Sequence, residues 1–219
     1  MGLDRLTSAP VLSLLVLLAA ACSSGGGRPE HLLDGSPAPE FRPVPNSVIA
    51  ATRLLDRSDV KGCPVAAGDS DVPADARVVE RTGVDDRSVT FASRDGSRVY
   101  ACDGGIDPAG ERGPPWCGGV VGEREHGRLL DPRLDVVCVD RVHRPLAYVF
   151  VEPVPHARWI GVADDGYVEL YEVVAGLPVR VAGHRGIDLE SARAAFEVTQ
   201  YDATGRELVR EELEAAVAG

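Results

Sequence analysis

The side chains that could act as acids, bases or metal ligands are scattered along this chain. Asp140 and His143 are close in sequence, but no activated serine or free thiol accompanies them, and no G-x-S-x-G element exists. No two histidines have the H-E-x-x-H or H-x-H spacing of a metal site. We therefore expect no catalytic residues and interpret every histidine as a surface or loop residue: His31, His126, His143, His156 and His184.

One short segment concentrates carboxylates, at Asp69, Asp71 and Asp75. Several carboxylates on one loop can coordinate Ca²⁺ through oxygen. However, Pro73 stands where the fifth-position ligand of an EF-hand loop belongs, and no glycine follows it. We expect a solvated acidic loop, and no metal or other cofactor.

Ser58 and Lys61 have the S-x-x-K spacing, which resembles the nucleophile motif of penicillin-binding proteins and β-lactamases. The S-D-N and K-T-G elements of that family are missing, and the surrounding sequence lacks a helical pattern that would present the serine. The segment is interpreted as a polar turn before Cys63.

The segment ending at Cys22 has a different kind of chemistry. An uncharged run from Pro10 to Ala21 ends in Leu18-Ala19-Ala20-Ala21-Cys22 and is followed by serine and glycine. The run suits the apolar region of a secretory signal and is shorter than the roughly 20 residues that span a bilayer. The pattern resembles the lipobox of bacterial lipoprotein precursors.

This resemblance implies that residues 1–21 are a signal peptide and that Cys22 is the lipidated first residue of the mature chain. Two acyl chains, such as palmitate, hold a soluble domain on a membrane where one chain does not. The expected location is the extracytoplasmic face of the cell membrane. An ordinary secretory signal with an incidental cysteine is the alternative interpretation.

Export would expose four further cysteines to an oxidising compartment, where an even number indicates disulfides. Three pairings are open for Cys63, Cys102, Cys117 and Cys138. We favour Cys102 with Cys117, because the segment between them is rich in glycine and proline, and hence Cys63 with Cys138. A zinc site is disfavoured, because no pair has the C-x₂₋₄-C spacing.

The formal net charge is −11. An acidic surface argues against nucleic acid and anionic lipid headgroups as main partners, because both require basic patches.

The chain is expected to contain a tether and a folded region. Residues 22–45 are rich in glycine, proline and serine, which is typical of a flexible linker. Residues 46–219 form the expected domain, with a possible division into halves 46–127 and 128–219. The division rests on a similar G-[VI]-D-x-x-S pattern at Gly83 and Gly186, each followed by an aromatic strand and a hairpin turn; chance similarity is the alternative.

The folded region has a β pattern with little helix. Short β-branched or aromatic runs predict strands, and Asp95-Gly96 and Asp165-Gly166 predict hairpin turns between them. The predicted strands are 77–80, 88–92, 98–101, 134–139, 146–151, 158–163, 167–174 and 178–182. We therefore expect a mainly β, antiparallel, sandwich-like fold.

The end of the chain allows two interpretations. Residues 205–217 are compatible with a helix, whereas 206–209 is also compatible with a strand that pairs with 193–201 through a turn at 202–205. We favour the hairpin, because Phe196, Val198 and Gln200 alternate as in a strand.

Aromatic side chains are few, so their positions are informative. Trp116, next to Cys117, is expected to pack on a disulfide. Trp159, Tyr167 and Tyr171 flank one predicted hairpin, and strand 167–173 is expected to be buried on one side with rings on the other. These three rings are the candidate binding surface, although core packing is the more common role of such residues.

The expected function is that of a non-catalytic binding module at the cell surface, engaging an envelope protein, a wall polymer or an exported ligand. An envelope hydrolase or transferase with an unfamiliar site is one alternative. The solute-binding component of a transporter is another, although the βαβ alternation typical of that class is missing.

Overall fold

The structure is a computed structural model that describes residues 44–56, 63, 76, 78–105, 116–132, 135–139, 144–191 and 193–216. The chain divides into two compact units, Met1–Glu30 and His31–Gly219, and every described residue belongs to the second. The description below concerns that unit. Within the described residues all regular structure is β-strand, and no helix long and apolar enough to cross a membrane occurs among them.

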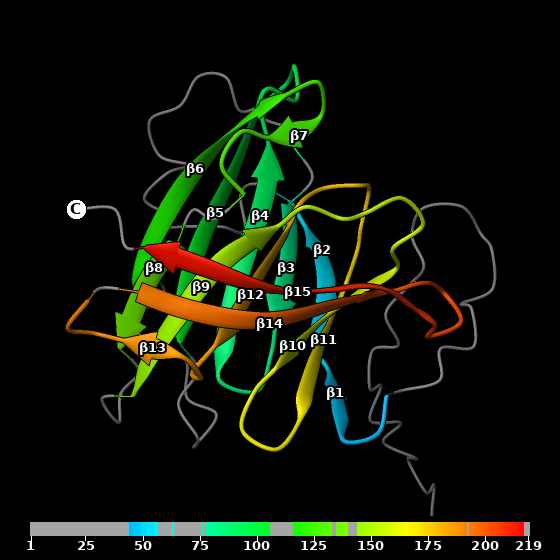
Figure 1. The fold of residues 1–219 in the computed structure, drawn as a ribbon. Helices are drawn as coiled ribbons and strands as arrows, with labels where there is room; N and C mark the ends of the chain where they lie inside the picture. The colour runs from blue at the N-terminus through cyan, green and yellow to red at the C-terminus, as the bar shows by residue number, and fades with distance from the viewer. Residues whose placement is uncertain are drawn as a thin grey trace, which may run out of the picture. The chain divides into compact units, whose positions relative to one another are not determined.

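The strands form three sheets (Figure 1). The first, here called the meander sheet, pairs each strand with the next in antiparallel order: β2 (Ala51–Leu55), β3 (Val78–Thr82), β4 (Asp86–Ala92), β5 (Arg98–Gly105), β6 (Gly118–Glu125) and β7 (Arg128–Leu129). The second, the middle sheet, has the order β12 (Val179–Gly183), β9 (Pro145–Val151) and β8 (Asp135–Val139).

The third, the hairpin sheet, contains the remaining strands: β1 (Ser47–Ile49), β11 (Val168–Glu172), β10 (Trp159–Ala163), β14 (Arg193–Tyr201), β13 (Ile187–Asp188) and β15 (Glu207–Ala216). Its pairs are antiparallel except that β1 lies parallel to β11. The expected mainly β, antiparallel, sandwich-like architecture is confirmed.

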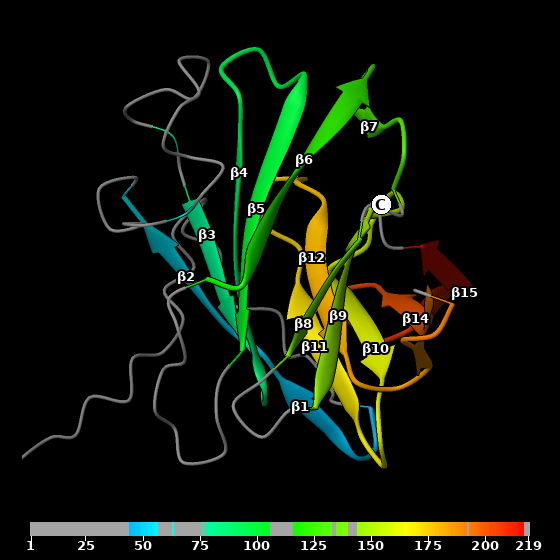
Figure 2. The ribbon, with the colours of Figure 1, turned by 90° about the vertical axis from the view of Figure 1, so that its left-hand side faces the viewer.

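The middle sheet lies between the other two, as Figure 2 shows. Its strand β9 is buried from Leu146 to Val151, because alternate side chains face opposite neighbours. Val149 joins the core of the hairpin sheet with Ile160 and Phe196, whereas Phe150 joins a cluster from the meander sheet with Val99. Burial on both faces explains the nearly continuous apolar sequence of this strand.

The chain crosses from one outer sheet to the other at Ala50. The backbone N–H of Ala50 donates to the carbonyl of Leu170 at 2.9 Å, which extends the pairing of β1 with β11 by one residue. The next residue begins β2 in the meander sheet. Ala50 itself is 2% exposed and belongs to the same core cluster as Val149 and Ile160.

The predicted hairpin turns are confirmed. Gly96, Gly166 and Gly205 have φ values of 72°, 83° and 83°, a region that glycine adopts without strain. The last of these turns joins β14 to β15, so residues 207–216 form a strand and not the alternative helix.

The two G-[VI]-D-x-x-S segments have different local structures. Gly186 has a φ of 72° and precedes the two-residue strand β13. Gly83 has no positive φ and lies in the tight turn before β4, where its N–H donates to the carbonyl of Asp86 at 2.9 Å. The division into halves at residues 127 and 128 stays a prediction, and β1, from the first half, pairs with β11 of the second.

The structure contains two disulfides, but their pairing differs from the favoured one. Cys63 is bonded to Cys102, and Cys117 to Cys138. The ladder between β5 and β6 already brings Cys102 next to Gly119, so no disulfide is needed to close the intervening loop. Each bond instead joins separate elements: the first lies in the apolar cluster over the outer face of the meander sheet, and the second links β8 to the residue before β6.

Trp116 packs against the cluster that contains Cys63 and Cys102, with the guanidinium of Arg87 4.5 Å from the centroid of its ring. Trp116 was predicted to pack on a disulfide, and this position agrees. The disulfide is Cys63–Cys102 and not the one that its neighbour Cys117 forms.

Peptide mapping of the oxidised protein under non-reducing conditions should yield the pairs Cys63–Cys102 and Cys117–Cys138. In the loop-entropy description, loops of these lengths stabilise the fold by about 3–4 kcal/mol each, so replacing Cys117 and Cys138 together with serine should lower the free energy of unfolding by about that amount. Recovery of a peptide that joins Cys102 to Cys117 would contradict this topology.

Candidate functional site

The structure does not gather the three rings of the predicted binding surface. Trp159 lies opposite Glu172 at one end of the β10–β11 hairpin, and Tyr167 lies at the other end, next to the pair of Ala163 with Val168. Tyr171 is 0% exposed and belongs to the core. Glu169, Leu170 and Tyr171 are all buried, so strand β11 is buried on both faces. The prediction of a strand buried on one side with rings on the other is wrong. A role of Trp159 and Tyr167 in ligand contact stays a prediction.

Of the histidines, His126 and His156 are exposed in turns with positive φ, and His184 is half-buried. Several sequence candidates lie outside the described residues: Cys22, His31, Ser58, Lys61, Asp69, Asp71, Asp75, Asp140 and His143.

A pair of buried carboxyl groups, Asp86 and Glu169, joins the meander sheet to the hairpin sheet. Asp86 is the first residue of β4 and is 1% exposed; Glu169 lies in β11 and is 4% exposed. Both groups reach the turn at Gly83, where an added Cβ would overlap an oxygen of each. Glycine at position 83 therefore makes the close approach of the two acids possible.

Tyr171 connects the two acids. Its hydroxyl oxygen lies 3.0 Å from Oε2 of Glu169 and 3.4 Å from Oδ1 of Asp86, and it accepts a hydrogen bond from the N–H of Ala182 at 3.3 Å. The N–H of Val84 donates to Oε1 of Glu169 at 2.7 Å. One hydroxyl hydrogen can be donated to only one acid at a time, so the second close contact is favourable when the pair itself holds a proton.

Burial and mutual repulsion favour that proton. Burial raises the pKa of Asp86 well above its ordinary value, and the neighbouring Glu169 adds to the effect. Burial also raises the pKa of Glu169 to about 7, against the opposing hydrogen bonds from Val84 and Tyr171. The two groups interact, so the proton that these shifts favour belongs to the pair and not to either acid alone.

A second group of polar side chains, here called the loop-end cluster, lies beside this pair and consists of Asp85, Arg144, Asp164, Tyr167 and His184. Asp85 lies 3.0 Å from Nη2 of Arg144 and 3.3 Å from Nε2 of His184. The backbone N–H of His184 donates to Asp164 at 3.2 Å, and Nδ1 of His184 lies 2.6 Å from the carbonyl oxygen of Pro145. Burial, followed by Glu169 and Asp164, raises the pKa of Tyr167.

The loop-end cluster is the part of this polar region that reaches the surface. The side chain of Arg144 is 45% exposed, and neighbouring Val84 is 44% exposed. Its residues come from four loops or strand ends, which precede β4, β9, β11 and β13. The sequence singled out Tyr167 but not the cluster, because the contributing residues lie far apart in the chain. The local signal was the adjacent acids Asp85 and Asp86 at the start of β4.

The meander and middle sheets are joined by a second buried charge contact. Arg180 of β12 donates through Nε and Nη2 to the carboxylate of Asp103 in β5 at 3.1 and 2.9 Å, and both side chains are 0% exposed. The guanidinium also lies 4.8 Å from the ring centroid of Phe150. Two parallel N–H···O bonds fix the lateral position of one sheet relative to the other.

These features determine the chemistry that the described residues can perform. Paired carboxyl groups with one raised pKa are suited to general acid catalysis, but both acids are enclosed between sheets. Among the described residues, no group of three or more His, Cys, Asp or Glu side chains is arranged to hold a metal ion. The polar groups that reach the surface are those of the loop-end cluster, which carries charges of both signs.

Comparison with protein-family models, with curated proteins and with solved structures finds no match for this chain.

The raised pKa values predict that stability falls as pH rises. A carboxyl group whose pKa is higher in the folded than in the unfolded state stabilises the fold while it is protonated. This stabilisation is lost as the pH rises from the unfolded pKa to the folded pKa, which for Glu169 are 4.5 and about 7. Denaturant titrations at pH 4.5 to 8 should show this decrease, and E169Q, which stays neutral, should reduce it. The exposed acid Glu197 supplies the control E197Q, which should keep the wild-type profile. An unchanged profile in E169Q would show that this acid does not titrate in that range.

Removing one partner of the Asp103–Arg180 bridge should be strongly destabilising. R180M leaves a buried, unpaired carboxylate and should lower the free energy of unfolding by about 3–5 kcal/mol, whereas D103L/R180M should recover most of the loss. The exposed Arg210, which contacts Glu197 and Glu207, provides the control R210M with a small effect. Equal effects of R180M and R210M in urea denaturation would contradict the assigned role.

Proposed function

We propose that this chain is a lipid-anchored, extracytoplasmic lipoprotein whose β domain is a non-catalytic binding module at the bacterial cell surface. One observation is the main support for the lipid anchor and the location: an uncharged apolar run ends at Cys22 and is followed by serine and glycine. A tether of glycine, proline and serine after this cysteine suits a domain held at a distance from the membrane.

The disulfides of the domain support the proposed extracytoplasmic location. Cys63–Cys102 and Cys117–Cys138 are compatible with an oxidising compartment outside the cytoplasm. Each bond joins elements that are distant in sequence. Both bonds would therefore stabilise a domain that works outside the cytoplasm, where reducing agents and chaperones are absent.

The accessible polar groups support binding in preference to catalysis. The best general-acid candidate, Glu169, is 4% exposed and lies against Asp86, where a substrate has no access. The loop-end cluster presents an exposed cation, Arg144, beside exposed Val84 and half-buried Tyr167. Charged, apolar and aromatic groups on adjacent loops suit contact with an envelope protein, a wall polymer or an exported ligand.

A hydrolase is the second candidate, and the raised pKa of Glu169 beside a second carboxyl group favours it. Two variants distinguish the hydrolase from the binding module. Loss of turnover of a wall substrate in E169Q would support the hydrolase, whereas loss of partner binding in R144A, with E169Q unaffected, would support the binding module.

The lipid anchor is tested by expressing the full chain and C22A in a bacterium with a lipoprotein pathway. The wild type should fractionate with membranes, and mass spectrometry should find a diacylglycerol-modified Cys22 as its first residue. C22A should be released or retain its leader, while C117S serves as the control that keeps the anchor. An intact Met1 or an unmodified Cys22 in the wild type would overturn the proposed address.

A further inference from the structure

A row of polar side chains crosses the inner face of the meander sheet. Thr52 lies opposite Arg81, Arg81 opposite Ser88, and Ser88 opposite Asp103 on four successive strands. Directly paired residues point to the same side of a sheet. The row faces the other sheets, because Arg81 donates to the carbonyl of Glu172 in β11 and Asp103 binds Arg180 in β12. Asp86 and Thr90 extend it along β4.

Arg81 occupies a particular position in this row. It is 0% exposed, and its Nε and Nη2 donate to the carbonyl oxygen of Glu172 at 3.2 and 2.9 Å. On the same edge of β11, the carbonyl of Leu170 is bonded by the N–H of Ala50, after which the chain leaves for the meander sheet. The next carbonyl on this edge is that of Glu172. If β1 continued beyond Ala50, its backbone would bond this carbonyl; the guanidinium of Arg81 does so instead.

Five polar atoms on this face have no hydrogen-bond partner among the described residues: Thr52 Oγ1, Arg81 Nη1, Asp86 Oδ2, Ser88 Oγ and Thr90 Oγ1. Arg81, Ser88 and Thr90 are 0% exposed and Asp86 is 1% exposed. A buried polar atom without a partner loses its hydration and gains nothing in return, so native proteins rarely leave such atoms dry. A concentration on one face of one sheet requires a common explanation.

We propose that ordered water molecules occupy this face, here called the seam, and connect the cation of Arg81 through Ser88 to the carboxyl group of Asp86. Water both donates and accepts, as this set of groups requires: Arg81 can only donate, an ionised Asp86 can only accept, and the hydroxyl groups do either. Buried water is common in folded proteins, and each molecule usually makes about three hydrogen bonds.

The positions of the groups favour several waters over a single bound ion. Asp86 and Thr90 are four residues apart on one strand, a separation of roughly 13 Å, which no single small ion spans. The carboxyl groups of Asp86, Glu169 and Asp103 near the seam also disfavour an anion, although Arg81 is a buried cation. An anion at Arg81 is therefore the outcome that the test must distinguish.

Thr90 allows a stability test with a nearly isosteric change. If its hydroxyl binds an internal water, T90V removes that bond and should lower the melting temperature. If the seam is dry, T90V replaces an unpaired hydroxyl with a methyl group and should raise it. Val89, which faces the apolar cluster on the opposite side of β4, supplies the reference V89T, in which a hydroxyl enters a dry interface and the melting temperature should fall.

A crystal structure of the mature protein, with a bromide soak, tests the occupant directly. Ordered water peaks within hydrogen-bond distance of Arg81 Nη1 and Ser88 Oγ, with no anomalous peak, are expected. An empty seam together with a higher melting temperature in T90V would overturn the proposal. A bromide peak at Arg81 would replace it with an anion site.

Discussion

The fold depends on how charged side chains are buried between sheets. The middle sheet contacts the hairpin sheet through an apolar core that includes Val149, Ile160 and Phe196. Its opposite face meets the meander sheet through both apolar and charged contacts: Phe150 packs with Val99, and Arg180 binds Asp103. A buried ion pair adds little net stability compared with an apolar contact, but a bidentate geometry specifies one lateral arrangement. The apolar contacts therefore supply most of the stability, and the buried ion pair supplies the register between the middle and meander sheets.

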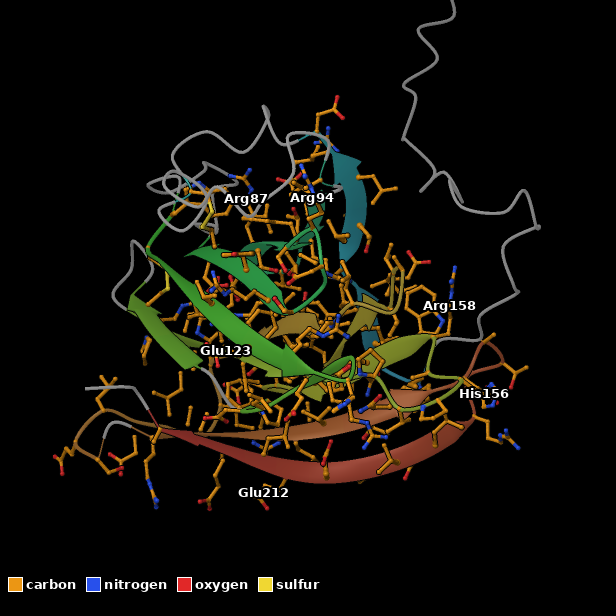
Figure 3. The ribbon with its side chains drawn as sticks, turned by 90° about the horizontal axis from the view of Figure 1, so that it is seen from above. Arg87, Arg94, Glu123, His156, Arg158 and Glu212 are labelled. Atoms are coloured by element: carbon orange, nitrogen blue, oxygen red, sulfur yellow. A yellow bond between two sulfur atoms is a disulfide. The ribbon has the colours of Figure 1, made fainter. Side chains whose placement is uncertain are left out.

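The polar groups between the sheets also extend towards the surface of the domain. Figure 3 shows Arg87 and Glu212 on opposite sides of the domain, and they belong to the meander sheet and the hairpin sheet. Among the described residues, polar side chains continue from the interior to the surface where the loops before β4, β9, β11 and β13 meet, at Asp85, Arg144 and His184. A fixed interior beneath a group of loops is a common arrangement in binding domains, because the scaffold holds the loops in place.

Local sequence determines part of this structure and not the rest. The hairpins β4–β5, β10–β11 and β14–β15 could be predicted, because Asp-Gly turns and alternating residues act within a few positions. Strand β6 was missed because Gly118, Gly119 and Gly122 lack the β-branched side chains that indicate strands. The disulfide pairing was wrong because it depends on which sheets become neighbours. The pair of Asp86 and Glu169 was missed for the same reason: each is an ordinary acid in its own strand, and only the contact between sheets brings them together.

Asp86 and Glu169 are expected to retain a proton between the sheets. Carbon-13 NMR titration of the side-chain carboxyl groups tests it most directly, with Asp95 and Asp202 as internal references, because hydrogen bonds in exposed turns lower the pKa of both. At pH 6 we expect a protonated carboxyl signal from the Asp86–Glu169 pair and ionised signals from both references. Full ionisation of Asp86 and Glu169 by pH 5 would contradict the account.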